Sequence, residues 1–301
     1  MTTPSPVDSS DLIARASAAG LTLDLDSVRL EEAGLDYRVA FARDLDGTEW
    51  VLRLPRRPDV TARLSEEQRI LDFVSGRLPV AVPRWQIVRP ELIAYRRLPG
   101  SPGLTLDANK QPIWHFDPTS PEFASALGRL IAKLHALDPQ EAAQAGVPHA
   151  TMDEVRENWR TELRAVQAEF AIAADLLEGW QTWLDDDSFW GGSTVMTHGE
   201  LYAAHVLVET PDRIVGVLDW TTAKVGDPAL DFTYQSMMGP ETLEQTVRAY
   251  REAGGAEHPN LARRCAGILA AMPITYGLFA LRSGDPEHRT TAAAMLDPHD
   301  P

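Results

Sequence analysis

Residues 196–232 read MTHGELYAAHVLVETPDRIVGVLDWTTAKVGDPALDF, and this stretch decides what fold the chain is expected to adopt. Two short runs rich in Val, Ile and Leu, at 205–208 and 214–218, are separated by a polar segment that contains Pro211 and Asp212. Apolar, β-branched runs joined by residues typical of turns predict a β-hairpin. Such a hairpin would place the segment before its first strand and the residue after its second strand at the same end.

Three polar side chains would meet at that end of the hairpin. Glu200 lies in the loop before the first strand, His205 begins that strand, and Asp219 directly follows the second strand. Phosphoryl transfer needs one group that orients and deprotonates an attacking hydroxyl, and others that hold the Mg²⁺ ion bridging the phosphates. We therefore predict Glu200 as the catalytic base and His205 and Asp219 as metal ligands.

The same stretch resembles the catalytic loop of the aminoglycoside and macrolide phosphotransferases, which is similar to the catalytic and metal-binding segments of protein kinases. The family pattern is His-Gly-Asp, four residues, then Asn or His, and later an Asp after a strand. Here these positions hold His198-Gly199-Glu200, His205 and Asp219. With His205 in place of the more common Asn, and with DWTTAKVGDP at 219–228, the chain resembles the macrolide 2′-phosphotransferases in particular.

This resemblance implies an α+β, bilobal protein-kinase-like fold. Residues 1–98 would form an N-terminal nucleotide-binding lobe with an antiparallel sheet, and residues 99–301 a larger, mainly helical lobe that binds the acceptor. The implied reaction transfers the γ-phosphate of GTP, or of ATP, to the 2′-hydroxyl of a macrolide amino sugar, with Mg²⁺ as cofactor. Such a transfer inactivates the macrolide and is a form of antibiotic resistance.

Glu200 departs from the family pattern, because the catalytic residue there is Asp. Glu carries one more methylene, and it still accepts a proton. The added length displaces the carboxylate by roughly an ångström, and such a displacement can cost on the order of a hundredfold in rate.

Composition limits the partners of the chain. With 301 residues, the chain is longer than a domain built around one typical core. Its formal net charge of −16 repels the phosphates of nucleic acid and favours a cationic small molecule. The single cysteine, Cys265, cannot form an internal disulfide, and no stretch resembles a signal peptide or a membrane span. We expect a cytoplasmic monomer that contacts neither nucleic acid nor membrane.

Three β-like runs, at 25–31, 37–43 and 49–54, predict the twisted antiparallel sheet of a kinase small lobe. By the resemblance, the loop at Gly34 would lie over the nucleotide phosphates. Arg53, in the third run, occupies the place of the phosphate-binding Lys of kinases, and Glu67 on the following helix would pair with it. Without the central motif, these two residues would be taken for surface charges.

The segment 92–100 ends in Pro-Gly and is expected to be the hinge between the lobes. By the resemblance, Tyr95, Arg96, Arg97 and Leu98 would contact the purine base. Macrolide kinases typically use GTP, but no residue of this segment distinguishes guanine from adenine.

The remainder of the chain is expected to be mainly helical. Residues 101–120 lack periodicity and predict a loop. Apolar spacings of three and four predict a helix at 121–137, two helices or one bent helix at 152–184, and a helix at 261–281 with a kink at Pro273.

Two residues outside the motif are expected to have structural roles. His135, near the end of an apolar helix, is expected to be a core or interlobe residue. The resemblance to kinases suggests that Asp231 accepts hydrogen bonds from the backbone of the loop that contains Glu200.

Two other functions remain open from the sequence. One is a kinase of the same fold that acts on an aminoglycoside, a choline-like alcohol or a sugar. The other is a non-catalytic kinase relic that only binds a ligand, which the replacements at Glu200 and Arg53 would allow. Retention of both metal-ligand positions, His205 and Asp219, weighs against the relic.

Overall fold

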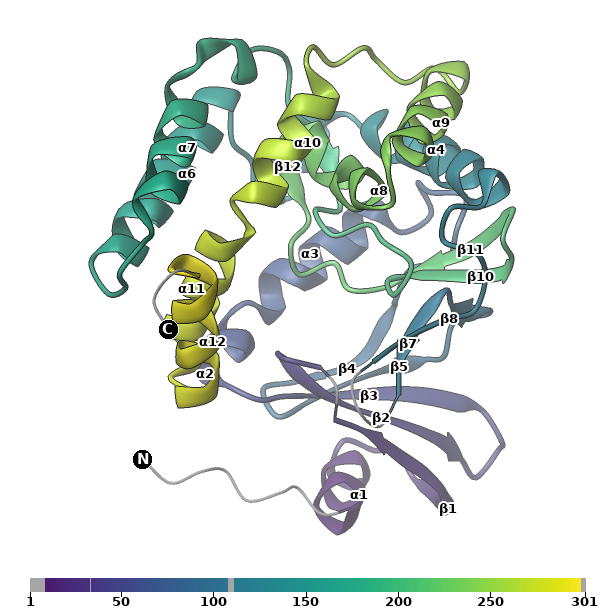
Figure 1. Ribbon diagram of the computed structural model, residues 1–301. Helices are drawn as coiled ribbons and strands as arrows, with labels where there is room; N and C mark the ends of the chain where they lie inside the picture. Colours follow the sequence, from purple (N-terminus) through teal and green to yellow (C-terminus); the bar gives the residue numbers. More distant parts are fainter. Residues whose placement is uncertain (1–8, 33, 108–110, 299–301) are drawn as a thin grey trace.

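The N-terminal part of the chain folds into an antiparallel sheet of five strands, in the order β1-β2-β3-β5-β4 (Figure 1). The structure is a computed structural model, and it describes residues 9–32, 34–107 and 111–298. The strands are β1 (Leu23–Glu31), β2 (Tyr37–Asp44), β3 (Glu49–Pro55), β4 (Trp85–Arg89) and β5 (Leu92–Arg96). The antiparallel sheet expected at the N-terminus is therefore confirmed.

Strand β3 sends successive side chains to opposite faces of this sheet. Leu52 packs on one face with α1 (Ser9–Ala18), whereas Val51 packs on the other face with the beginning of α3 (Leu64–Val74). Arg53 has the same parity as Val51. It therefore lies on the face that α3 covers.

Between β5 and β6 (Ser101–Pro102) the chain leaves this sheet and joins a second one, in the order β11-β10-β6. Strands β10 (Val206–Thr210) and β11 (Arg213–Val217) form the hairpin expected from the central stretch. The lobe boundary at residues 98 and 99 falls in this crossing and stays a prediction. Its outer limits, residues 1 and 301, lie outside the described residues.

The expectation of a loop over residues 101–120 is wrong. This segment contains β6 and a small hairpin of β7 (Leu104–Leu106) and β8 (Pro112–Trp114). Strands of two or three residues are too short to show an alternating pattern. The partner of β6 is also distant in the sequence, because Pro102 pairs with Leu207.

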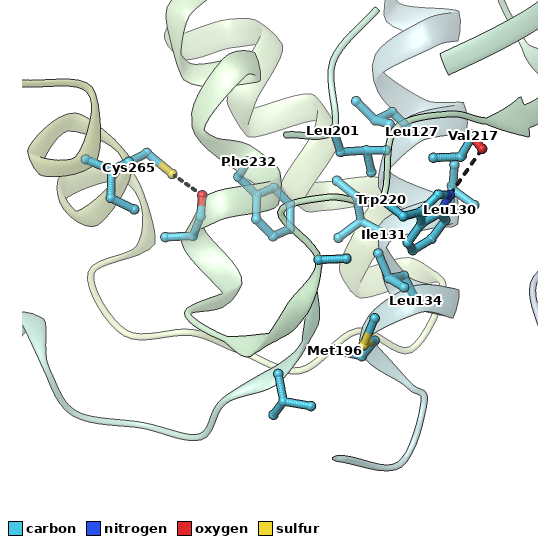
Figure 2. Packing of buried hydrophobic residues seen from close by; sticks show 14 of the residues in the cluster. Leu127, Leu130, Ile131, Leu134, Met196, Leu201, Val217, Trp220, Phe232 and Cys265 are labelled. Atoms are coloured by element: carbon cyan, nitrogen blue, oxygen red, sulfur yellow. Dashed lines mark hydrogen bonds between the residues drawn. The ribbon is translucent and has the colours of Figure 1, made fainter. Parts of the chain in front are cut away.

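The C-terminal part is mainly helical (Figure 1). Its elements enclose a large cluster of buried apolar residues. In the N-terminal part, the short helix α2 (Pro58–Ala62) precedes α3. The remaining elements of the C-terminal part are α4 (Pro121–His135), α5 (Pro139–Gln144), α6 (Met152–Gln167), α7 (Ala174–Asp185), η1 (Asp187–Phe189), β9 (Val195–Thr197), β12 (Lys224–Gly226), η2 (Pro228–Phe232), α8 (Thr233–Met237), α9 (Pro240–Glu252), α10 (Leu261–Ala270), α11 (Met272–Ser283) and α12 (Pro286–Leu296). Figure 2 shows Leu127, Ile131 and Leu134 of α4 in the same apolar cluster as Met196 and Phe232.

Of the two alternatives expected for 152–184, the structure contains the two helices, α6 and α7. In the break between them, the N–H of Ala173 donates to the carbonyl of Leu296 over 2.9 Å. The helix expected at 261–281 is the pair α10 and α11, bent by 41°. Pro273 does not kink a continuous helix, since it lies in the first turn of α11, where its missing N–H costs no hydrogen bond.

Over the described part of the chain, no single helix is long and apolar enough to cross a membrane, and only the bent pair α10 and α11 has sufficient length and apolar composition.

Gly128 provides a test of the packing between α4 and α9, because a Cβ atom there would overlap the carbonyl oxygen of Thr246. We expect Gly128→Ala to lower the free energy of unfolding by about 1–3 kcal/mol, since a helix backbone cannot move aside as a flexible side chain can. In the control Gly179→Ala, on α7, the added Cβ would meet no atom within 4 Å. Helix propensity should make that variant more stable by about 0.5–1 kcal/mol. Urea unfolding measures the free energy of unfolding of both variants, and equal stability of the two would contradict this packing of α4 against α9.

Candidate active site

The hairpin brings His205 and Asp219 together at its open end. Val206 lies opposite Val217, and the backbone N–H of Leu218 donates to the carbonyl of His205 over 2.8 Å. As a result, Nε2 of His205 lies 3.7 Å from Oδ2 of Asp219. The structure thus contains the juxtaposition that the sequence predicts.

A buried carboxylate, Asp231, holds the loop that precedes the hairpin. Its oxygens accept hydrogen bonds from the backbone N–H groups of His198, at 3.1 Å to each oxygen, and of Gly199, at 2.7 Å. Nε2 of His135, which is buried in the core, lies 3.1 Å from Oδ2 of Asp231. Gly199 has a φ of 90°, and a Cβ there would lie 2.9 Å from the carbonyl oxygen of Thr222, so the loop requires glycine. The contacts expected for Asp231 and the core location expected for His135 are both observed.

The backbone of Glu200 is fixed on both sides by histidine rings. Its N–H donates to Nδ1 of His198 over 3.3 Å, and its carbonyl oxygen lies 3.0 Å from Nδ1 of His205. Because a carbonyl oxygen only accepts, Nδ1 of His205 carries a proton, and in the neutral ring Nε2 keeps a lone pair on the side of Asp219. In His198 the roles are reversed, and Nε2 donates to the carbonyl of Leu218 over 2.9 Å.

Burial and neighbouring charges give the two carboxyl groups different acidities. Burial alone would raise the pKa of Asp219, but Arg53, together with His205 when its ring is protonated, outweighs it and lowers this pKa to about 2. Burial raises the pKa of Glu200, His205 opposes that effect, and Asp219 adds to it. Asp219 is therefore a permanent anion suited to a cation, whereas Glu200 is the better proton acceptor.

Arg53 and Glu67 form the ion pair expected from the sequence. Nη1 of Arg53 lies 2.6 Å from Oε1 of Glu67, and both side chains are buried. The Tyr37 hydroxyl donates to the other Glu67 oxygen over 3.1 Å, and the guanidinium lies 3.8 Å from the centre of the Tyr37 ring. Burial would lower the pKa of Arg53, but Glu67 and then Asp219 outweigh it and raise this pKa. Arg53 therefore links the N-terminal sheet electrostatically to the hairpin.

The residues predicted to contact a purine base lie at the end of β5 and directly after it. Tyr95 is buried in the cluster on the α3 face of the sheet. Arg96 and Arg97 are exposed, and Leu98 is half-buried. Nη1 of Arg97 lies 3.5 Å from Oε1 of Glu49, which directs this side chain along the sheet. The backbone N–H of Arg97 donates to the carbonyl of Glu49 over 2.9 Å, so contact of this segment with a base stays a prediction.

The loop between β1 and β2 contains the predicted Gly34 and an acidic residue that sequence reasoning missed. Gly34 is exposed. Asp36 accepts hydrogen bonds from Arg57, at 2.6 Å, and from Arg63, at 3.3 Å. After burial and Asp219, Asp36 is a further group that raises the pKa of Glu200. A lone Asp in a loop carries no local signal of such a long-range contact.

Two tyrosines beside Glu200 were also not predicted. The rings of Tyr202 and Tyr234 are stacked, with centroids 4.6 Å apart and an interplanar angle of 18°. Burial, followed by Glu200, raises the pKa of Tyr234, and Tyr234 in turn opposes the effect of burial on the pKa of Glu200. The available signal was the spacing of Tyr234, which follows Asp231 by three residues and so belongs to the segment that holds the loop.

Asp219 and His205, at the open end of the hairpin, fit a metal ion that is bound partly by the protein and partly by the substrate. Within residues 9–32, 34–107 and 111–298, no three His, Cys, Asp or Glu side chains gather into a complete metal site. Mg²⁺ usually keeps several waters and binds one or two protein groups together with substrate phosphates. The carboxylate of Asp219 and the lone pair of His205 would supply such a partial set, although oxygen is the more usual ligand of Mg²⁺.

Comparisons with known proteins agree with this geometry. A sequence model of the phosphotransferase enzyme family matches residues 28–267. The crystal structure of the macrolide 2′-phosphotransferase MphH from Brachybacterium faecium is similar, with a TM-score of 0.87 and 49% identity over 98% of this chain and 100% of that chain. A macrolide 2′-phosphotransferase type I has a TM-score of 0.88 and 38% identity over 98% of this chain and 99% of that chain. The uncharacterized protein YcbJ of Bacillus subtilis (strain 168) is 36% identical over 290 residues, which are 95% of each protein.

The ring of His198 tests the electrostatics of the loop. Burial, and then the nearby His205, lower its pKa from 6.5 to about 4. The unfolded chain therefore binds this proton first as the pH falls, and the folded state should lose up to ~1.4 kcal/mol of stability per pH unit between the two pKa values. NMR titration of the metal-free protein should give a midpoint near pH 4, with His198→Asn used to assign the signal. A midpoint at or above 6.5 would contradict a buried, neutral ring.

Proposed function

The chain belongs to the phosphotransferase enzyme family, and from this we propose that it transfers the γ-phosphate of a nucleoside triphosphate to the 2′-hydroxyl of a macrolide amino sugar. The observation that carries the proposal is the 49% identity, over 98% of the chain, to a macrolide 2′-phosphotransferase. The site supports it chemically. A candidate base and two candidate metal ligands lie at one end of the hairpin, and a cation suited to phosphate faces them from the N-terminal sheet.

In the proposed reaction the residues of the chain position the reactants and accept one proton. Glu200 accepts the proton of the acceptor hydroxyl as the oxygen of that hydroxyl attacks the γ-phosphorus. Burial favours this proton transfer because it raises the pKa of Glu200. His205 and Asp219 would hold Mg²⁺, which when bound neutralises charge on the phosphates. Arg53, held in place by Glu67, would bind phosphate oxygens with its guanidinium.

GTP is the proposed donor, with ATP as the alternative. The phosphates would lie between Arg53 and the open end of the hairpin, below the loop at Gly34. The base would meet the backbone from Tyr95 to Leu98, where the chain crosses between the two sheets. This placement of the phosphates and the base of the nucleotide along the N-terminal part rests on the kinase-like fold.

A cationic acceptor suits the charge of the site. The amino sugar of a macrolide carries a dimethylammonium next to the 2′-hydroxyl. Glu200 and Asp219 supply two neighbouring carboxyl groups at the proposed site, and the net charge of the chain is −16. A protonated amine would therefore be drawn to this region. We also propose that the protein acts as a cytoplasmic monomer.

Mass spectrometry of erythromycin incubated with the protein, Mg²⁺ and either GTP or ATP tests the proposal. The expected product carries one added phosphate. Glu200→Gln removes the base but keeps the size of the side chain, so kcat should fall at least about a hundredfold while nucleotide affinity stays nearly unchanged. The control is Glu178→Gln, on the exposed side of α7, which should behave like the wild type.

Each other outcome has a distinct meaning. Transfer to an aminoglycoside or another alcohol, without transfer to a macrolide, would assign a different acceptor to the same fold. Loss of nucleotide affinity in Glu200→Gln would make Glu200 a structural or metal-binding residue. If the wild type transfers nothing and Glu200→Asp transfers phosphate, the natural chain is a relic.

A further inference from the structure

We propose that Thr221 is a positioning residue of the candidate metal site, because its hydroxyl turns the Asp219 carboxylate so that one oxygen faces His205. This inference rests on the proposed function, in which Asp219 and His205 would hold Mg²⁺. It gives a role to the segment DWTTAKVGDP at 219–228, of which the proposed mechanism uses only Asp219. It assigns Thr221 no bond to the metal ion and no contact with a substrate.

The backbone on both sides of Asp219 is fixed by other residues. Before it, the N–H of Leu218 donates to the carbonyl of His205 over 2.8 Å. After it, the buried ring of Trp220 is tied back, because its Nε1–H donates to the carbonyl of Val217 over 3.2 Å (Figure 2). Asp219 itself has a φ of 56°, a left-handed conformation that aspartate adopts more readily than most residues. The Cα atom is thus held, and only the two side-chain torsions of Asp219 remain to be set.

Thr221 sets these torsions through one of the two carboxylate oxygens. Its hydroxyl donates to Oδ1 of Asp219 over 2.7 Å, and its backbone N–H donates to the same atom over 3.4 Å. An aspartate that accepts from the residue two positions later forms an Asx-turn, so the contact is local and stiff. Oδ1 is therefore engaged by the protein, and Oδ2 is the oxygen that lies 3.7 Å from Nε2 of His205.

The free oxygen and the His205 ring present two ligand atoms to one ion. Nδ1 of His205 lies 3.0 Å from the carbonyl oxygen of Glu200, so the neutral ring keeps its lone pair on Nε2. Two metal–ligand bonds of about 2.1 Å each span at most about 4.2 Å, which is longer than the 3.7 Å between Oδ2 and Nε2. Groups that hydrogen-bond a metal ligand in this way typically change metal affinity by about 10–100-fold. The hydrogen bond from Thr221 therefore prepares both atoms for the same ion.

The neighbouring threonine has a different partner, which separates the roles of the two hydroxyls. The Thr222 hydroxyl donates to the carbonyl of His198 over 2.9 Å and so ties this segment to the loop that precedes the hairpin. Thr221 is half-buried and borders a small hollow that Tyr37 and Glu67 of the N-terminal part also line. A hydrogen bond that is partly shielded from water orients its acceptor more firmly than an exposed one.

The competing explanation is that Thr221 only stabilises the turn after β11. Binding of Mn²⁺, measured by electron paramagnetic resonance in the presence of a non-transferable analogue of GTP or of ATP, separates the two. Thr221→Val removes the hydroxyl and keeps the branched shape, and we expect it to raise the Kd for Mn²⁺ at least about tenfold. Thr221→Ser keeps the hydroxyl and should bind Mn²⁺ within about threefold of the wild type. If Thr221→Val does not fold, Thr221→Ala takes its place with the same expectation.

The matched control is Thr210→Val, at the other end of the same hairpin. There, too, a threonine hydroxyl donates to Oδ1 of an aspartate, Asp212, over 2.7 Å. The control therefore loses the same kind of hydrogen bond and should keep the Mn²⁺ affinity of the wild type. Thermal unfolding without metal confirms that all compared variants are folded.

Steady-state rates supply a second readout that a role in the turn alone would not produce. In Thr221→Val, the Mg²⁺ concentration for half-maximal rate should rise at least about tenfold, and kcat at saturating Mg²⁺ should recover to within about threefold of the wild type. Three results would each overturn the proposal: unchanged Mn²⁺ affinity in Thr221→Val, an equal loss of affinity in Thr221→Ser, or a deficit in kcat that Mg²⁺ does not recover.

The failure of this inference is distinguishable from the failure of the proposed function. Binding of Mn²⁺ with the nucleotide analogue needs no acceptor, so a wrong acceptor does not affect it. If Asp219→Ala leaves the Mn²⁺ affinity unchanged, Asp219 is not a metal ligand, and the proposed mechanism fails together with the inference. If Asp219→Ala weakens Mn²⁺ binding and Thr221→Val does not, the inference alone fails.

Discussion

The hydrogen bonds from the loop backbone to the buried Asp231 are the constraint on which the rest of the site depends. They fix His198 and Gly199, and the ring of His198 in turn accepts the N–H of Glu200. The carboxylate is supported from behind by His135, whose Nδ1 lies 3.2 Å from the Tyr250 hydroxyl. Hydrogen bonds of this kind are strong because the surroundings exclude water, and their loss would leave buried polar groups without partners. The backbone of Glu200 is therefore positioned by the buried side chains of His198 and Asp231.

The N-terminal sheet completes the site by charge and by backbone pairing. Arg53 lowers the pKa of Asp219, which lies across the boundary between the two parts of the chain. The segment before β4 also pairs with β11, since the N–H of Ala81 donates to the carbonyl of Val215 over 2.8 Å and the N–H of Val217 donates to Ala81 over 2.9 Å. The hairpin that carries the candidate metal ligands is thus held by both parts of the chain.

The sequence predicted those elements that depend mainly on residues close together in the chain. The hairpin followed from two β-branched runs and a turn, whereas the pair of Arg53 with Glu67 was predicted from the resemblance to kinases. Strands β7 and β8 were too short to show an alternating pattern, and the partner of β6 is distant in the sequence. A bend at Pro273 was predicted, but this residue begins α11 and does not kink a continuous helix. Asp36 and Tyr234 were not predicted, because they are ordinary loop and helix residues in the sequence and affect the pKa of Glu200 only through the fold.

We propose that this chain places phosphate on the 2′-hydroxyl of a macrolide amino sugar. The most direct test is a phosphorus–proton correlation NMR spectrum of the purified product. We expect a single phosphate resonance coupled to the proton on C2′ of the amino sugar, formed only in the presence of a divalent cation. Coupling to a proton elsewhere on the macrolide, or formation of the product without the cation, would contradict it.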